Sequence, residues 1–219
     1  MKRLALIHTV SWYNKSVIHP FADPWQKLNP DVEIINIMDD SLLTESLANG
    51  GPTKDVTRRM LNYFLAAESA GADVIMSTCT TMGPCTRLAR QIVQKPVFNI
   101  DEPMAKEAVS KGGVLGILAT LPTSAPATKM LLEIEANEQR KKIGIKITIN
   151  EEAWKYLLNG EISKHNELIY HELERIQNEV DVIVLGQISL AQIKFKTKVP
   201  MLQVGHSGFS YARKLLDHK

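Results

Sequence analysis

Cysteine is scarce in this chain of 219 residues, which contains only Cys79 and Cys85. Two cysteines cannot build the disulfide framework that stabilises small secreted proteins, so we expect a reducing compartment. No histidine accompanies them at the spacing of a zinc site, and we expect no bound metal. The pair is therefore read as two free thiols.

Long apolar runs and charge of one sign are also missing. No run approaches the length that spans a membrane, and the opening residues lack the apolar core of a signal peptide. The net charge is only +2 with both signs intermixed, which does not favour nucleic acid or a membrane surface as a partner. Neither a GxGxxG nor a Walker pattern occurs, so we expect no phosphate-binding loop. These absences predict a cytoplasmic protein, with homo-oligomerisation left open.

Short apolar runs alternate with longer amphipathic stretches, and 44% of the residues are hydrophobic, enough to form a core. Alternation of this kind predicts an α/β fold with parallel sheets covered by helices. The helical patterns include Asp55–Ala70, His165–Glu179 and Phe209–Leu216. The expected strands are Leu4–Ile7, Val32–Ile37, Val74–Ser77, Val97–Ile100, Val114–Leu118, Ile143–Ile149, Val182–Leu185 and Met201–Val204.

The expected strands match in two sets of four. Asp73-Val74-Ile75 recurs as Asp181-Val182-Ile183, and the run from Leu4 to Thr9 resembles the run from Leu115 to Thr120. Two further strand pairs match in the same order. We therefore predict two pseudo-symmetric lobes, each a four-stranded parallel sheet flanked by helices. Lobe one would cover 1–108 with a returning helix at 207–219, and lobe two would cover 109–206.

Ligands of parallel α/β sheets bind beyond the carboxyl ends of the strands. In this chain hydroxyl groups and one thiol dominate those places, and such groups suit a small carboxylate. Cys79 ends a buried strand and precedes a helical pattern, which predicts a stabilised thiolate with a depressed pKa. Alternatively, Cys79 is only a small buried residue at the point where the strand meets the helix. Cys85, inside the helical pattern, is read as core.

The repeat aligns Cys79 with Gln187. His8 closes the first strand, where it could orient a ligand or simply be a satisfied structural histidine. These residues form the candidate site together with a set of hydroxyl-bearing residues that follow strand ends: Thr9, Thr80, Thr81, Thr120, Thr123 and Ser189.

Over nearly the whole chain, these segments resemble the aspartate/glutamate/hydantoin racemase superfamily, which includes cofactor-independent amino-acid racemases, maleate isomerases and arylmalonate decarboxylases. The resemblance is carried by Ala72 to Ile75 leading to Cys79-Thr80-Thr81, by Gly116 to Thr120 with Thr123, and by Leu185-Gly186. It implies a pocket between two lobes, each of which contributes one cysteine next to the substrate carbon. By the same resemblance, Cys79 is the first cysteine, and Thr80 and Thr81 hold the substrate carboxylate.

The departure from the family is Gln187, which stands where the second cysteine is expected. A glutamine amide forms hydrogen bonds but does not shuttle a proton near neutral pH. We therefore expect a cofactor-independent isomerase or racemase-like enzyme that acts on a small carboxylic acid through one cysteine, Cys79. Two alternatives remain open: a one-cysteine decarboxylase of a malonate- or keto-acid-like substrate, and a non-catalytic protein that binds a small carboxylate.

Overall fold

A computed structural model of the chain describes residues 1–218 and divides them into two compact units. Lobe one consists of Met1–Glu102 together with the residues from Gly205 onward, and lobe two is Pro103–Val204. The boundary lies at the start of helix α5 (Glu102–Lys111), six residues before the position expected from the repeat. The second boundary precedes helix α9 (His206–Asp217), so this helix belongs to lobe one.

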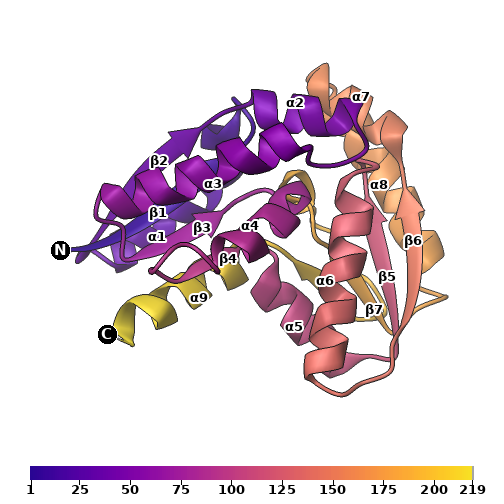
Figure 1. The fold of residues 1–219 in the computed structure, drawn as a ribbon. Helices are drawn as coiled ribbons and strands as arrows, with labels where there is room; N and C mark the ends of the chain where they lie inside the picture. Colours follow the sequence, from indigo (N-terminus) through magenta and orange to yellow (C-terminus); the bar gives the residue numbers. More distant parts are fainter. Residues whose placement is uncertain (219) are drawn as a thin grey trace. The chain divides into compact units, whose positions relative to one another are not determined.

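Lobe one contains a four-stranded parallel sheet in the order β2-β1-β3-β4 (Figure 1). Its strands are β1 (Lys2–His8), β2 (Val32–Met38), β3 (Val74–Ser77) and β4 (Val97–Asn99). Its helical segments are η1 (Asn14–Ala22), α1 (Asp23–Leu28), α2 (Ser41–Ala48), α3 (Lys54–Ser69), η2 (Thr80–Met82), α4 (Gly83–Ala89) and α9.

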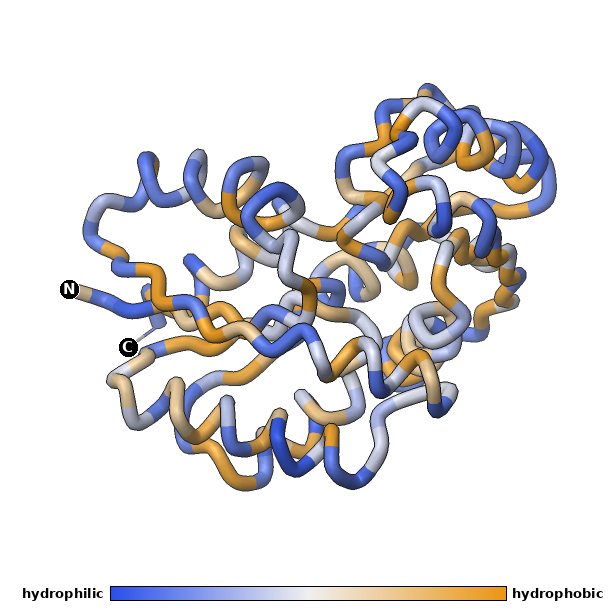
Figure 2. The backbone as a smooth tube through the Cα atoms, turned by 90° about the horizontal axis from the view of Figure 1, so that it is seen from above, coloured by the Kyte–Doolittle hydropathy of each residue, from blue (hydrophilic) through white to orange (hydrophobic). Residues whose placement is uncertain are grey.

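Helices cover both faces of this sheet. Ala5, Ile7 and Ile75 pack against a core formed with α2, α3 and α4. On the other face, Phe98 packs edge-to-face against Tyr211 of α9, and Figure 1 shows α3 and α9 on opposite sides of β3. Burial on both sides explains why the inner strands β1 and β3 contain continuous apolar runs, whereas the edge strand β2 is only partly buried. Figure 2 shows this contrast, because the strand that leaves the labelled N-terminus becomes mostly apolar while surrounding helices alternate in hydropathy.

Lobe two repeats the same topology, with a four-stranded parallel sheet in the order β6-β5-β7-β8. Helices α6 and α8 lie on opposite sides of β5 (Figure 1). The strands are β5 (Val114–Ala119), β6 (Gly144–Ile149), β7 (Val182–Leu185) and β8 (Met201–Gln203). The helical segments are α5, α6 (Ser124–Glu138), α7 (Glu151–Leu158), α8 (Ile162–Ile176) and η3 (Ile188–Leu190).

The predicted architecture of two four-stranded parallel sheets with flanking helices is thus confirmed. The helices η1 and α1, with Pro20 and Pro24 in them, were not among the expected elements. Proline normally ends a helix. Here Pro20 lies inside η1, which is a π-helix, and Pro24 lies in the first turn of α1, where proline is tolerated. Within residues 1–218, no helix is long and apolar enough to cross a membrane.

Candidate active site

Cys79 follows β3, the inner strand beside β1 in lobe one, and its extended backbone leads into the short helix η2. The side chain is half-buried and borders the core that α3 and α4 form with the sheet. Its carbonyl oxygen accepts a hydrogen bond of 3.2 Å from Asn99 Nδ2, which follows from the position of Asn99 on the neighbouring strand β4. The turn that carries the thiol is therefore tied to the adjacent strand end.

Burial raises the pKa of the Cys79 thiol, and the negative charge of Asp101 raises it further. The Thr9 side chain and the N–H groups of Thr81 and Met82 lower the pKa, but burial is the largest effect. The predicted depressed pKa is therefore wrong. The helix argument fails because α4, the first α-helix after the thiol, begins only at Gly83 and spans only seven residues. Burial at the edge of an apolar core destabilises the thiolate by more than so short a helix stabilises it.

Cys85 lies on α4 and is 1% exposed, in contact with the lobe-one core. Its Sγ lies 3.6 Å from Thr57 Oγ1 of α3. Burial also raises the pKa of this thiol. The prediction that Cys85 fills the core is confirmed.

The expected hydroxyl groups of lobe one gather around Cys79. Thr9 follows β1, and Thr80 and Thr81 follow the thiol itself, all three with at most 4% of their surface exposed. The Thr9 side chain is near enough to the thiol to affect its pKa, yet within residues 1–218 its hydroxyl makes no hydrogen bond of normal geometry. A buried hydroxyl without a partner is costly, and Thr9 shares this state with Ser77 at the end of β3. Ligand binding by Thr9 stays a prediction.

His8, at the end of β1, is fully buried and already satisfied. Its Nδ1 lies 3.0 Å from Thr78 Oγ1 and its Nε2 lies 2.9 Å from Asn36 Oδ1, and its ring stacks on Tyr13. Burial lowers the pKa of His8 to about 4, so the ring is neutral at pH 7. Ligand binding by His8 stays a prediction, but both nitrogens are used within lobe one.

Gln187 holds in lobe two the place that Cys79 holds in lobe one. Each follows the inner strand beside the first strand of its lobe, in extended conformation, immediately before a short helix. Thr120 likewise follows β5 as Thr9 follows β1. These equivalences are the ones that the repeat predicts.

The Gln187 amide uses its whole hydrogen-bonding capacity within lobe two. Its Oε1 accepts from Thr120 N at 3.1 Å, Leu121 N at 3.3 Å and Ser124 Oγ at 2.9 Å. Its Nε2 donates to Thr120 Oγ1 at 2.7 Å and to Ser189 Oγ at 2.6 Å. Two backbone N–H groups and a hydroxyl are a donor set typical of carboxylate recognition, and here an amide oxygen occupies it.

Comparison with known proteins agrees with this arrangement. Residues 21–212 match the family model for Asp/Glu/hydantoin racemase. The chain belongs to the Asp/Glu/hydantoin racemase family. Family membership makes the protein an enzyme of the cofactor-independent racemase superfamily and supports a racemase-like function on small carboxylates. A search of curated proteins found no significant match.

Solved structures of racemases share the fold of this family member. Aspartate racemase from Picrophilus torridus is 16% identical, with a TM-score of 0.70 over 99% of this chain and 93% of that chain. Allantoin racemase from Klebsiella pneumoniae is 19% identical, with a TM-score of 0.70 over 99% and 88% of the two chains. Glutamate racemase from Thermus thermophilus is 15% identical, with a TM-score of 0.71 over 99% and 80%. At these identities the likeness establishes the fold.

Three residues of this racemase-family chain contact the predicted site residues but were not predicted to belong to the site. Ser124 donates to Gln187, and Asn99 and Asp101 form a buried pair beside the Cys79 turn. Asn99 and Asp101 lie at the carboxyl end of β4, which is itself a strand-end position of the kind used to find the other residues. Of the other predicted residues in lobe two, Thr123 is the N-cap residue of α6, although its side chain makes no capping hydrogen bond. Ser189 accepts a hydrogen bond from Gln187.

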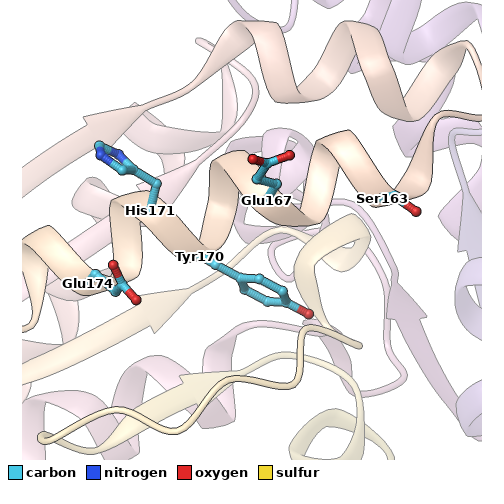
Figure 3. Close-up of a pocket in the computed structure, with 5 residues that line it drawn as sticks. All are labelled: Ser163, Glu167, Tyr170, His171 and Glu174. Carbon is cyan, nitrogen blue, oxygen red and sulfur yellow. The ribbon is translucent and has the colours of Figure 1, made fainter.

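A surface depression of lobe two lies elsewhere, along one helix. Figure 3 shows it on α8, where it is lined by Ser163, Glu167, Tyr170, His171 and Glu174. It does not lie at the carboxyl ends of the strands, since all five residues are on α8. Among residues 1–218, no group of three or more His, Cys, Asp or Glu side chains could hold a metal ion. The depression adds nothing to the racemase chemistry.

Proposed function

We propose that this racemase-family enzyme acts on a small carboxylic acid with Cys79 as its single thiol proton carrier. The observation that carries the proposal is the state of Gln187, whose amide stands at the place equivalent to Cys79 with every hydrogen-bonding position occupied. An amide in this state neither accepts nor releases a proton near neutral pH. The proposal includes no cofactor.

In the proposed mechanism, the Cys79 thiolate removes the proton from the carbon next to the carboxylate. The electron pair moves onto the carboxylate, whose oxygens need hydrogen-bond donors, and the Thr9 hydroxyl is the unpartnered donor beside the thiol. Thr80 and Thr81 belong to the same turn and hold the carboxylate, Thr80 through its backbone N–H because its hydroxyl donates to Asp101. The same thiol then returns the proton. Return to the same carbon regenerates the substrate with its proton exchanged for a solvent hydrogen, whereas return to another carbon of an unsaturated acid isomerises it.

A decarboxylase is the second candidate, and the raised pKa of Cys79 favours it. Loss of CO₂ breaks a carbon–carbon bond and leaves its electron pair on carbon. A thiol that is kept protonated is a suitable acid for that carbanion, after which the thiolate takes a proton from water. The raised pKa also means that the isomerase reaction becomes faster as pH rises, because it requires the thiolate.

The test begins with a thermal-shift screen of small monocarboxylic, dicarboxylic, malonic and keto acids, because a ligand of the native state raises the melting temperature. Acids that bind are then incubated with the wild type, Cys79→Ser and Cys85→Ser in D₂O and followed by NMR. We expect deuterium uptake or isomerisation with the wild type and with Cys85→Ser, and none with Cys79→Ser. Release of CO₂ that depends on Cys79 indicates the decarboxylase. Binding without turnover, or turnover that survives Cys79→Ser, contradicts the proposal.

A further inference from the structure

Asp101 is a buried carboxyl group in lobe one that the proposed mechanism does not yet use. It lies two residues beyond the end of β4 and is 1% exposed. Its Oδ1 accepts a hydrogen bond of 2.7 Å from Asn99 Nδ2, and the Thr80 side chain also donates to this carboxylate. Buried carboxyl groups are uncommon because they lose their hydration, so this one calls for a specific explanation.

The two partners of Asp101 connect it directly to the turn that carries the thiol. Asn99 Nδ2 also donates to the carbonyl oxygen of Cys79 at 3.2 Å, and Thr80 is the next residue in the chain. Asn99 is in turn held by Thr86 Oγ1 of α4, which donates to its Oδ1 at 3.2 Å. Asp101 therefore fixes the Cys79–Thr80 turn from the neighbouring strand end, through two separate side chains.

The charges that face Asp101 come from two other elements. Burial is the main cause that raises the pKa of Asp101, to about 6, and Glu102 at the start of α5 raises it as well. Glu102 is itself paired with Arg90, which screens part of its charge. The third ionisable group is Cys79, whose pKa the Asp101 charge raises. A carboxylate and a thiolate are thus competing negative charges at one buried site.

We propose that Asp101 is a positioning residue for Cys79, because it holds the Cys79–Thr80 turn through Asn99 and Thr80 and places a buried carboxylate next to that turn. When Asp101 is ionised, its negative charge disfavours the thiolate, so the thiol holds its proton more tightly. When Asp101 is protonated, one negative charge is removed from the site and the thiolate forms more readily. No proton passes between the two groups in this account, because the coupling is electrostatic. The inference builds on the proposed role of Cys79, but it is tested on the thiol itself.

The test measures alkylation of Cys79 by iodoacetamide, resolved from Cys85 by peptide mass mapping, because only the thiolate reacts. Asp101→Asn removes the charge while keeping the shape. We expect this variant to be alkylated at Cys79 at least roughly threefold faster than the wild type at pH 7.5. The matched control is Asp39→Asn, which removes a carboxylate after β2 at the opposite edge of the same sheet. It should leave the rate at Cys79 unchanged.

A second measurement needs no variant. For an uncoupled thiol, the logarithm of the alkylation rate rises with unit slope until the thiol ionises. In the unmodified protein we expect the slope to fall below one near pH 6, where Asp101 loses its proton, and to recover above it. A unit slope from pH 5 to 8, or equal rates in Asp101→Asn and wild type, overturns the coupling. Neither readout depends on turnover, so failure of the proposed enzyme activity is recognised separately in the substrate assay.

Discussion

The Gln187 side chain occupies, with its own amide oxygen, a set of hydrogen-bond donors in lobe two. Its amide oxygen accepts from Thr120 N, Leu121 N and Ser124 Oγ, which are the donors that a carboxylate oxygen would require. Its amide group also binds the hydroxyls of Thr120 and Ser189. The side chain is 6% exposed, so removing it leaves several polar groups buried without partners.

Gln187→Ala should therefore lower the free energy of unfolding by about 2 to 4 kcal/mol, since unsatisfied buried donors cost more than one hydrogen bond. Urea unfolding followed by circular dichroism measures this. Gln177→Ala is the control: Gln177 lies in the same lobe after α8, its hydrogen bonds with Lys198 N and Glu174 O are exposed to solvent, and its loss should cost under about 1 kcal/mol.

The same variant offers a chemical rescue. Formate or acetate can occupy the donors that Gln187→Ala uncovers, so either anion should raise the melting temperature of the variant more than that of the wild type or of Gln177→Ala. If the anions raise the melting temperature of all three proteins equally, or if Gln187→Ala is as stable as the wild type, the amide does not fill an anion site.

At the scale of elements, the two lobes repeat one local arrangement. In each lobe an inner strand, β3 or β7, leads through an extended residue into a short helix, η2 or η3. The inner strands β3 and β7 could be predicted because strands buried on both faces are apolar throughout, and the repeat in the sequence supported the more exposed strands β2 and β6. Helix ends were displaced, as in α8, which begins three residues before the expected His165. The helices η1 and α1 could not be predicted, because their two prolines resemble breaks.

The site was predictable in position and less so in chemistry. The place of Cys79 follows from strand periodicity alone. Its raised pKa does not, because burial depends on packing by α3 and α4 and on the Asp101 charge. The contacts of Gln187 with Thr120 and Ser124 join residues more than sixty positions apart, so they arise only when the lobe folds.

Helix α3 supports the Cys79 face of the lobe-one sheet, and its first turn depends on one cap. Thr53 Oγ1 accepts a hydrogen bond of 3.1 Å from Val56 N. Thr53→Ala should lower the free energy of unfolding by about 1 kcal/mol, whereas Thr53→Ser, which keeps the hydroxyl, should cost much less. Thermal melts of the two variants test this, and equal losses would contradict a capping role.

At the scale of the whole molecule, two buried groups make opposite contributions to the pH dependence of stability. Folding raises the pKa of Asp101 from 3.8 to about 6, so its contribution is lost as pH rises through that range. Folding lowers the pKa of His8 from 6.5 to about 4, so its contribution is lost as pH falls through that range. Each effect amounts to about 3 kcal/mol at most, and the two largely cancel between pH 4 and 6.

Asp101→Asn should remove the contribution of Asp101 to the pH dependence of stability. From pH 4 to 6.5 the free energy of unfolding should then rise more steeply in the variant than in the wild type, because the opposing contribution of Asp101 is gone and that of His8 remains. Urea titrations at half-unit pH steps give both curves. Parallel curves for the variant and the wild type would mean that Asp101 does not titrate in this range.

We propose that this enzyme works with one thiol proton carrier, whereas the family resemblance implies two. The most direct measurement takes a single enantiomer of an α-substituted acid that the enzyme binds, incubates it in D₂O, and follows α-proton exchange by NMR and configuration by chiral chromatography. A single thiol works from one face of the carbon, so the account predicts exchange with retained configuration, abolished by Cys79→Ser. Racemisation as fast as exchange in the wild type, or exchange that persists in Cys79→Ser, would contradict it.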